Sequence, residues 1–509
     1  MVETLEEEFL AYIKKMEALE EALALVYWDL RTGAPSKGME GRSDVIGVLS
    51  EEIFNMQTSE EMAAFIAGLN LDKENLSEIT LKTLEESQKK YDLNKKIPSK
   101  EYAEYTKLVA QAETAWTTAR EQNDFAAFEP FLTKILEMKR KFVEYWGYEE
   151  NKYDTLLDQY EPGVTVSVLD SVFEKVRDGI MAIREKIANE GVKPDATILN
   201  TKISEAKQKE FSIRILNKMG FDFEAGRLDE TVHPFATGLN TGDVRITTRY
   251  NENDFKMAVF GTIHEGGHAI YEQNFDAALV GTPLANGASM GIHESQSLFY
   301  EIIIGSSLAF WKSNYADFQA ITKPAFDHVT LEDFYRAVNI SESSLIRIEA
   351  DTLTYPLHIM IRYELEKALI NGELEVKDLP KAWGDKYEEY LGIRPDYLGI
   401  RPDNDTNGVL QDIHWAGGDF GYFPSYALGL MYAAQFFNQM QKEIPNIDAI
   451  IASDDYSELK TWLTEHVHKF GKTKKPLEIL TDTTGEGLNP TYLLDLLEKR
   501  YAYVYQFNK

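Results

Sequence analysis

The chain has 509 residues and a formal net charge of −31, with 84 acidic against 53 basic side chains. Such a charge disfavours nucleic acid as a partner, because a polyanion would be repelled. Hydrophobic residues make up 44% of the chain, enough for a sizeable core, and cysteine is absent, which excludes a disulfide framework and thiolate chemistry.

Apolar residues recur with a helical period along most of the chain. This spacing predicts helices over residues 3–30, 42–68, 76–94, 100–121, 126–146, 165–189, 203–219, 254–274, 294–312, 331–338 and 345–371. The exception is the stretch 243–250, where Val244, Ile246 and Thr248 alternate with other residues after the turn-rich stretch 238–242. We expect a small hairpin there, whose free edge could hold an extended peptide by strand addition.

Linkers of low complexity or like charge do not interrupt the sequence. The sequence therefore predicts one large, mostly α-helical domain over residues 1–509, with a helical N-terminal part to about residue 225. We expect a deep central groove and a small β-hairpin or sheet next to the helix at 254–274. The N-terminus is acidic, unlike a secretory signal, and no apolar stretch approaches the ~20 residues of a membrane span. A cytoplasmic protein without a membrane partner is the resulting expectation.

The predicted helix at 254–274 contains the pattern HExxH, read here as His264-Glu265-Gly266-Gly267-His268. In a helix the two histidines lie on one face, one turn apart. Two neutral imidazoles supply half of a tetrahedral zinc site, and the glutamate beside the first can act on a water at the open metal position. The pattern predicts a zinc site with Glu265 as a general base that does not bind the metal. The two glycines disfavour a helix, so we expect a neighbour to approach the backbone closely.

A third metal ligand must come from outside this pattern. The extended pattern HExxHxxGxxH fails, because Tyr271 and Asn274 stand where glycine and histidine are needed. Glu294, in the segment HESQ, is our preferred ligand, since a following antiparallel helix can return it to the site. The alternatives are Glu272, Asp276 and Glu301. His293 is expected to support the site or to pack, because a fourth protein ligand would close the catalytic position.

Four further segments accompany HEGGH and HESQ, in the order HPF at 233–235, DVRIT at 243–247, IRIEAD at 346–351 and GVLQDIHW at 408–415. Together the six segments resemble the Taq-like thermostable metallocarboxypeptidase family, and the motifs span positions 233–429 when GYFPSYALG at 421–429 is included. The resemblance implies a zinc-dependent carboxypeptidase of broad specificity that acts on peptides with a free C-terminal carboxylate. It also implies one Zn²⁺ per chain, with another divalent metal such as Co²⁺ as an alternative, and a homodimer.

The same resemblance assigns roles to further residues. Recognition of the terminal carboxylate falls to Arg347, with Gln411 and His414. An internal ion pair of Arg347 with Glu349 or Asp351 is the alternative. Donors to the developing oxyanion are expected among His414, Tyr422 and Tyr426, as in distantly similar helical zinc peptidases. The expected substrate-binding set is completed by His233, Asp243, Arg245 and Tyr426.

Two other functions remain open on the sequence alone. A zinc aminopeptidase or endo-oligopeptidase would share HExxH and a downstream glutamate, and a non-catalytic scaffold could retain the motifs. The histidines outside the motifs are expected to be ordinary surface or core residues: His328, His358, His466 and His468. One departure from the family pattern is a perfect tandem repeat, YLGIRPD at 390–396 and again at 397–403. A duplication or an artefact explains it better than function does, because a loop insertion of this size costs little entropy.

Overall fold

The computed structural model describes residues 4–391 and 402–508 of the chain. Most of these residues are helical. The helices of the N-terminal half are α1 (Leu5–Thr32), α2 (Met39–Gln57), α3 (Glu60–Asn70), α4 (Glu78–Lys96), α5 (Ser99–Gln122), α6 (Phe125–Trp146), α7 (Lys152–Leu157), α8 (Val166–Glu190) and α9 (Glu205–Met219). The later helices are α10 (Phe255–Gln273), α11 (Met290–Leu298), the π-helix η5 (Phe299–Gly305), α12 (Leu308–Thr322), α13 (Leu331–Val338), α14 (Tyr355–Asn371), α15 (Leu379–Leu391), α16 (His414–Gly417), α17 (Pro424–Glu443), α18 (Ile447–Ile451), α19 (Ser457–His466), α20 (Pro476–Thr484) and α21 (Thr491–Tyr505).

Local signals set several helix ends. Thr330 caps α13 by accepting a hydrogen bond from the Asp333 amide, so this helix coincides with the predicted range 331–338. Three expected helices are interrupted. The range 42–68 is divided where Ser59 caps α3, and 294–312 is divided into α11, η5 and α12. In the range 345–371, the regular helix α14 begins at Tyr355. Pro356 lies in its first turn, where proline is favoured.

The three strands form a small mixed sheet in the order β1-β3-β2, made of β1 (Gly226–Glu230), β2 (Ala236–Asn240) and β3 (Asp243–Thr248). The expected hairpin is confirmed by the antiparallel pair β2 and β3, whereas β1, which was not predicted, runs parallel to β3. Thr262 of α10 donates a buried hydrogen bond to Thr248 of β3 at 3.0 Å. The sheet therefore lies directly against the helix that carries HExxH.

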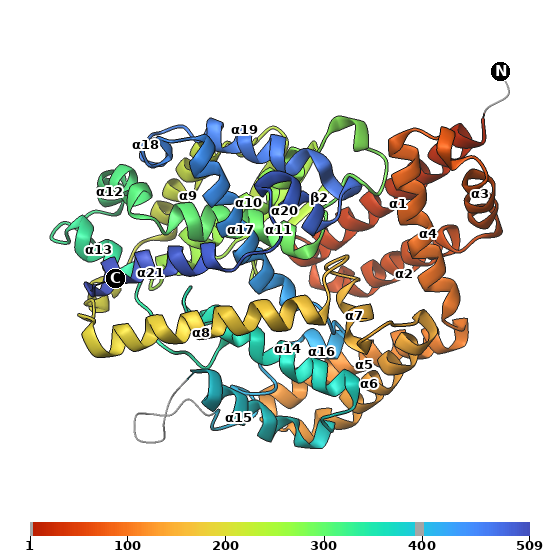
Figure 1. Ribbon diagram of the computed structural model, residues 1–509, viewed down its shortest axis with the longest axis horizontal. Coiled ribbons are helices and arrows are strands. Elements are labelled where there is room, and N and C mark those ends of the chain that lie inside the picture. The colour runs from red at the N-terminus through yellow and green to blue at the C-terminus, as the bar shows by residue number, and fades with distance from the viewer. Residues whose placement is uncertain (1–3, 392–401, 509) are drawn as a thin grey trace.

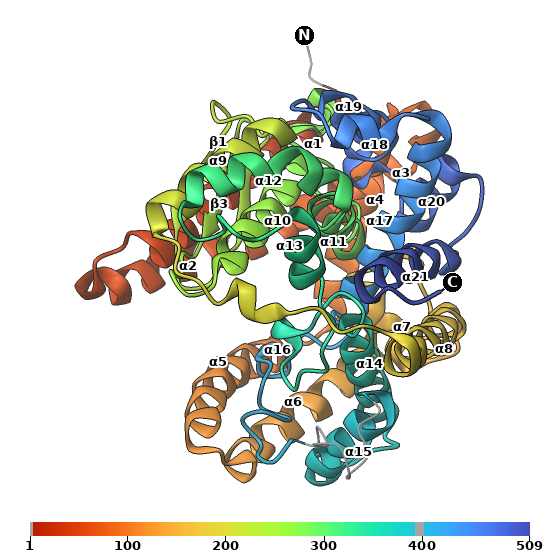
Figure 2. The same cartoon turned by 90° about the vertical axis from the view of Figure 1, so that its left-hand side faces the viewer.

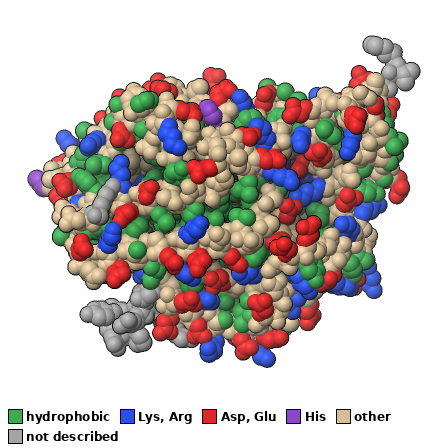
Figure 3. All heavy atoms as spheres, viewed as in Figure 1, with side chains coloured by type: hydrophobic (Ala, Val, Ile, Leu, Met, Phe, Trp, Pro, Cys, Tyr) green, Lys and Arg blue, Asp and Glu red, His purple; other side chains and the backbone are tan. Residues whose placement is uncertain are grey.

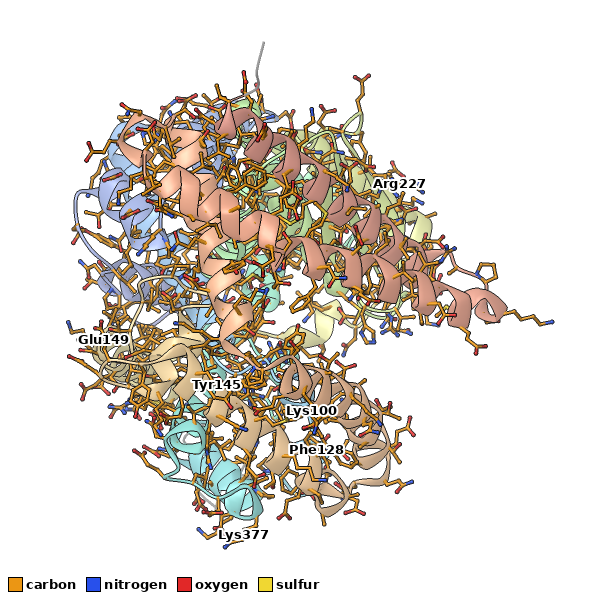
Figure 4. All side chains as sticks on the ribbon, turned by 90° about the vertical axis from the view of Figure 1, so that its right-hand side faces the viewer. Lys100, Phe128, Tyr145, Glu149, Arg227 and Lys377 are labelled. Atoms are coloured by element: carbon orange, nitrogen blue, oxygen red, sulfur yellow. The ribbon has the colours of Figure 1, made fainter. Side chains whose placement is uncertain are left out.

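The helices form an upper and a lower group in the views of Figure 1 and Figure 2. The upper group contains α10, α11 and α17 together with the sheet, and the lower group contains α5, α6, α14, α15 and α16. Figure 4 shows the same division, with Arg227 of β1 above and Lys100, Phe128 and Tyr145 of α5 and α6 below. The motif segments lie on both groups. Helix α17 contacts both α11 and α14, and its Tyr426 contacts His414 of α16, so the candidate site lies where α17 joins the two groups.

One hydrophobic cluster extends from α5 to α21, and a second, smaller one joins α1, α2, α3 and α4 around Phe9, Ile13 and Phe65. The single domain expected from the sequence stays a prediction. Acidic and basic side chains are interspersed over the face shown in Figure 3. Among the described residues, no helix has both the length and the apolar character that crossing a membrane requires. The tandem YLGIRPD repeat lies largely outside the described residues.

Candidate metal centre and substrate site

The two histidines of α10 and Glu294 of α11 lie together. Their potential ligand atoms are all within 4.8 Å of one another. The Nε2 atoms of His264 and His268 lie 3.8 and 3.5 Å from Oε2 of Glu294. The histidine side chains are 23% and 13% exposed, so the site can be reached from the surface. This is the donor set predicted for the metal.

Two glycines allow the helices around Glu294 to approach closely. A Cβ atom at Gly267 of α10 would lie 2.5 Å from the carbonyl oxygen of Gln296, in the backbone of α11. A Cβ atom at Gly429 of α17 would lie 2.8 Å from the side chain of Glu294. The close neighbour expected for the HExxH glycines is therefore, at Gly267, the helix that carries Glu294.

The remaining nitrogen of each histidine has a partner outside the donor set. His264 Nδ1 lies 2.8 Å from Oε2 of Glu301, on the π-helix η5. His268 Nδ1 lies 3.1 Å from the carbonyl oxygen of His293, whose own ring contacts Glu272 at 2.7 Å. Partners of this kind fix the ring orientation and leave Nε2 free for a metal. The residues therefore fit a tetrahedral metal with one open position.

The three alternative ligands take other roles. Glu301 contacts His264 through Nδ1, and Glu272 contacts His293. Asp276 accepts a hydrogen bond from the amide of Ala278 and caps a short turn. None of these three belongs to the donor cluster found among the described residues.

Glu265 is 8% exposed and lies beside the donor set without being part of it. Burial raises the pKa of this carboxyl to about 7, helped by the negative charges of Glu294 and Glu301 and opposed by His264. A carboxylate with a pKa near neutrality can both take and return a proton, which suits a general base.

A second cluster surrounds Arg347, which is 6% exposed. Its Nε and one terminal nitrogen lie 3.0 and 2.9 Å from Oδ1 of Asp412, and its other terminal nitrogen donates to the hydroxyl of Tyr355 at 3.1 Å. The guanidinium group lies 5.0 Å from the ring centre of Tyr426. Arg347 thus forms an internal ion pair, but the expected alternative partners, Glu349 and Asp351, were wrong, because Asp412 arrives from a distant part of the chain.

Gln411 is used mainly inside the protein. Its Oε1 accepts from the amide of Arg347 and from Arg362, at 3.0 and 2.8 Å. Its Nε2 lies within hydrogen-bond distance of Leu345, Tyr387 and Asn407. These contacts position the Arg347 segment against α14.

The expected oxyanion donors lie next to this cluster. Nε2 of His414 is 3.3 Å from the hydroxyl of Tyr426, and the rings of Tyr422 and Tyr426 are 5.2 Å apart. Burial, followed by the charge of Arg347, lowers the pKa of His414 to about 4, so its ring is neutral at pH 7. Burial raises the pKa of both tyrosines, and the charge of Glu294 adds to this increase. The hydroxyls are therefore protonated donors within the electrostatic reach of the metal centre.

The upstream motif residues have other neighbours. His233 is exposed in the loop before β2. Asp243 and Arg245 form two hydrogen bonds with each other, at 2.8 and 2.7 Å, and Arg245 lies 5.5 Å from the ring centre of Trp28. Arg245 and Trp28 line a cavity of about 370 Å³. The substrate-binding roles of His233, Asp243 and Arg245 stay predictions, as does the central groove.

Several residues of these clusters were missed by the sequence reasoning. Tyr355, Arg362 and Asp412 complete the Arg347 cluster. Asp412 lies in a recognised motif, GVLQDIHW, but nothing in the local pattern indicates its partners. The buried polar positions of α14 were the available signal, because charged residues in a core helix need a reason.

The fold and the donor set define a metallopeptidase in which an HExxH helix is completed by a glutamate from a second helix. The sequence model of the carboxypeptidase Taq (M32) metallopeptidase family matches residues 8–501, so the chain belongs to this family. It is therefore a metallocarboxypeptidase, a hydrolase of peptide bonds, as the motifs predicted.

Relatives of known type cover nearly the whole chain. Carboxypeptidase 1 of Bacillus subtilis (strain 168) is 52% identical over 504 residues, which are 99% of each chain. Thermostable carboxypeptidase 1 of Thermus thermophilus is 37% identical over 495 residues, which are 95% of each chain. Among solved structures, the M32 carboxypeptidase from Deinococcus radiodurans R1 has a TM-score of 0.94 at 33% identity, covering 99% of this chain and 100% of that one. Trypanosoma cruzi metallocarboxypeptidase 1 has a TM-score of 0.90 at 34% identity, covering 98% and 99%.

Proposed function

We propose that this metallocarboxypeptidase uses one zinc ion to remove C-terminal amino acids from peptides, with broad side-chain specificity. The observation that carries the proposal is the His264, His268 and Glu294 donor set. Helix α17 links this set to the buried Arg347 cluster, because its Tyr426 lies beside Arg347 and its Gly429 lies against Glu294. Another divalent metal such as Co²⁺ could occupy the same nitrogen and oxygen donors.

His264, His268 and Glu294 would hold the metal. A bound zinc ion would supply Lewis acidity, lowering the pKa of a water toward ~7 and polarising the scissile carbonyl. Glu265 takes the proton of the attacking water and passes it to the leaving amine. This transfer is worth roughly 10²–10⁴ in rate. Burial raises the pKa of Glu265, so this carboxyl can take and return a proton near neutral pH.

Donors for the carbonyl oxygen are His414, Tyr422 and Tyr426. Their support is the 3.3 Å contact between His414 and Tyr426 and the field of Glu294 at both hydroxyls. A preorganised donor stabilises negative charge as it develops on the substrate oxygen.

Arg347 is the proposed anchor for the terminal carboxylate of the substrate. Three of its five N–H groups point to Asp412 and Tyr355, which fixes the fork while two N–H groups have no partner among the described residues. A guanidinium group binds a carboxylate through paired hydrogen bonds. A peptide with a free carboxyl end is therefore the proposed substrate.

We also propose a homodimer that works in the cytoplasm. The support is analogy with the family for the dimer. For the compartment it is a chain without cysteine, which suits a reducing environment. Light scattering on an eluting chromatographic peak would distinguish a dimer from a monomer of 58.1 kDa.

One peptide with free ends, compared with its N-acetylated and C-amidated forms, tests the reaction. Mass spectrometry should show single residues leaving the C-terminus, with no effect of N-acetylation and strong slowing by amidation. Internal cleavage would indicate an endopeptidase, and sensitivity to N-acetylation would indicate an aminopeptidase. Arg347→Ala should lower kcat/KM on the free peptide at least about tenfold, because a charge-assisted hydrogen bond contributes ~1.5–3 kcal/mol. If this variant discriminates free from amidated ends as the parent does, the carboxylate anchor lies elsewhere.

A further inference from the structure

Helix α14 carries a row of buried polar residues outside the recognised motifs. His358, Arg362 and Glu366 are spaced by four residues, share one helical face and have no exposed surface. Arg362 and Glu366 contact the segment that follows Gly408. Arg362 donates to Oδ2 of Asp412 at 2.7 Å, and Glu366 accepts from the indole of Trp415 and the amide of Gly421 at 2.7 and 2.9 Å.

Charged groups buried this deeply require compensation or a function. Asp412 lies between two guanidinium groups: Arg347 occupies Oδ1 and Arg362 occupies Oδ2. One carboxylate between two arginines leaves one positive charge uncompensated. His414 does not alter this balance, because its ring is neutral at pH 7.

Other carboxylates near this cluster are engaged elsewhere. Glu294 belongs to the metal centre, and Glu366 accepts hydrogen bonds from Trp415, Gly421 and Tyr153. Among the residues that the structure describes, Asp412 is the one acidic side chain within ion-pair distance of Arg347 or Arg362. The anion that completes the balance is therefore expected from the substrate.

We propose that Arg362 is a positioning residue for the terminal carboxylate of the substrate. By neutralising Asp412, it leaves Arg347 with an uncompensated charge and a fixed orientation toward that carboxylate. Arg362 itself is fully buried and does not touch the substrate. This inference rests on the proposed role of Arg347.

Charge rescue in the holoenzyme tests the inference. The measured quantity is the ratio of kcat/KM on a free peptide to kcat/KM on its C-amidated form. R362Q brings the charge of the cluster to zero, so the ratio should fall about tenfold, mainly through a higher KM on the free peptide. The double variant R362Q/D412N restores one positive charge, so the ratio should return to within about threefold of the parent.

E366Q is the matched control. It loosens the same segment from the same helix but leaves the charges around Asp412 in place, so the ratio should stay at the parent value even where kcat falls. An equal fall of the ratio in E366Q would overturn the inference, because general loosening would then be sufficient. A parent-like ratio in R362Q, or a double variant that does not recover, would also overturn it.

R347A, measured in parallel, separates the two claims. If R347A keeps the parent ratio, the proposed anchor itself fails. If the ratio falls in R347A but stays at the parent value in R362Q, the role of Arg347 as the anchor stands and only the role of Arg362 fails. Should R362Q alone not fold, the double variant decides: a retained ratio supports the charge balance and a lost ratio overturns it.

Discussion

Three glycines of α10, at positions 261, 266 and 267, provide a graded test of how the metal centre is assembled. A Cβ atom at Gly261 would have no neighbour within 4 Å. At Gly266 it would meet Leu216 Cδ2 at 2.5 Å and Met219 Cε at 3.1 Å, which are the ends of flexible side chains. At Gly267 it would meet the backbone of α11 at Gln296 and Ser297, at 2.5 and 2.7 Å. The three substitutions to alanine therefore differ in what must move.

The magnitudes follow from helix propensity and packing. Alanine is favoured over glycine in a helix interior by ~1 kcal/mol, so Gly261→Ala should stabilise the protein by about that amount. Gly266→Ala should be near neutral, because side-chain rearrangement offsets the gain. At Gly267 overpacking costs about 1–3 kcal/mol, and since a backbone cannot rearrange like a side chain, a net loss of up to ~2 kcal/mol is expected. Gly267→Ala should also weaken metal binding about tenfold, because α11 carries Glu294.

Scanning calorimetry on the metal-free variants measures the order of stabilities. For 509 residues an unfolding entropy of ~2.1 cal/mol/K per residue makes 1 kcal/mol equal to about 1 °C in Tm. The highest Tm is expected for Gly261→Ala. The parent and Gly266→Ala should share an intermediate Tm, and Gly267→Ala should have the lowest. A Gly267→Ala protein as stable as Gly261→Ala, with unchanged metal affinity, would refute the close approach of the two helices.

Two further predictions concern the two charged clusters. Glu294→Ala should lose far more metal affinity in a titration than Glu272→Ala, because Glu294 lies 3.5 Å from His268 Nε2 whereas Glu272 contacts only His293 in this cluster; the reverse order would make Glu272 the ligand. The second concerns Asp412. Burial raises the pKa of its carboxyl, but the charges of Arg362 and Arg347 together lower it by more, so the pKa in the folded protein lies below the usual value. The stability it contributes is present above its unfolded pKa of ~3.9 and is lost as the pH falls through the folded pKa. Tm should therefore fall less steeply below about pH 5 in Asp412→Asn than in the parent, and parallel curves would contradict the charge assignment.

The candidate metal centre could be predicted because its geometry is mostly local. HExxH places two candidate ligands on one helical face through the helical repeat alone, and an antiparallel return of the chain brings Glu294 beside them. Glu301, an alternative ligand on sequence grounds, lies on a π-helix and contacts Nδ1 of His264, a placement that a regular helical period does not indicate.

Strand β1 and the Arg347 cluster could not be predicted, because both depend on pairing between separate segments of the chain. Strand β1 has the sequence GRLDE, which lacks apolar alternation. It owes its conformation to parallel pairing with β3, whose residues lie 18 positions further along the chain, as in the pair Gly226 and Val244. The link from Arg347 through Asp412 to Arg362 joins three chain segments whose spacing carries no periodic signal. The sequence predicted a continuous helix over 345–371 and therefore did not indicate this cluster. The first residues of that range instead form a turn and a loop that place Arg347 against Asp412.

In the proposed mechanism, His264, His268 and Glu294 hold the catalytic metal while Glu265 moves the proton. Glu265→Gln tests it most directly, by measuring metal content and turnover on one free peptide in the same preparation. We expect one metal ion per chain, as in the parent, with turnover reduced roughly 10²–10⁴-fold. Near-parental turnover, or loss of the metal together with activity, would contradict it.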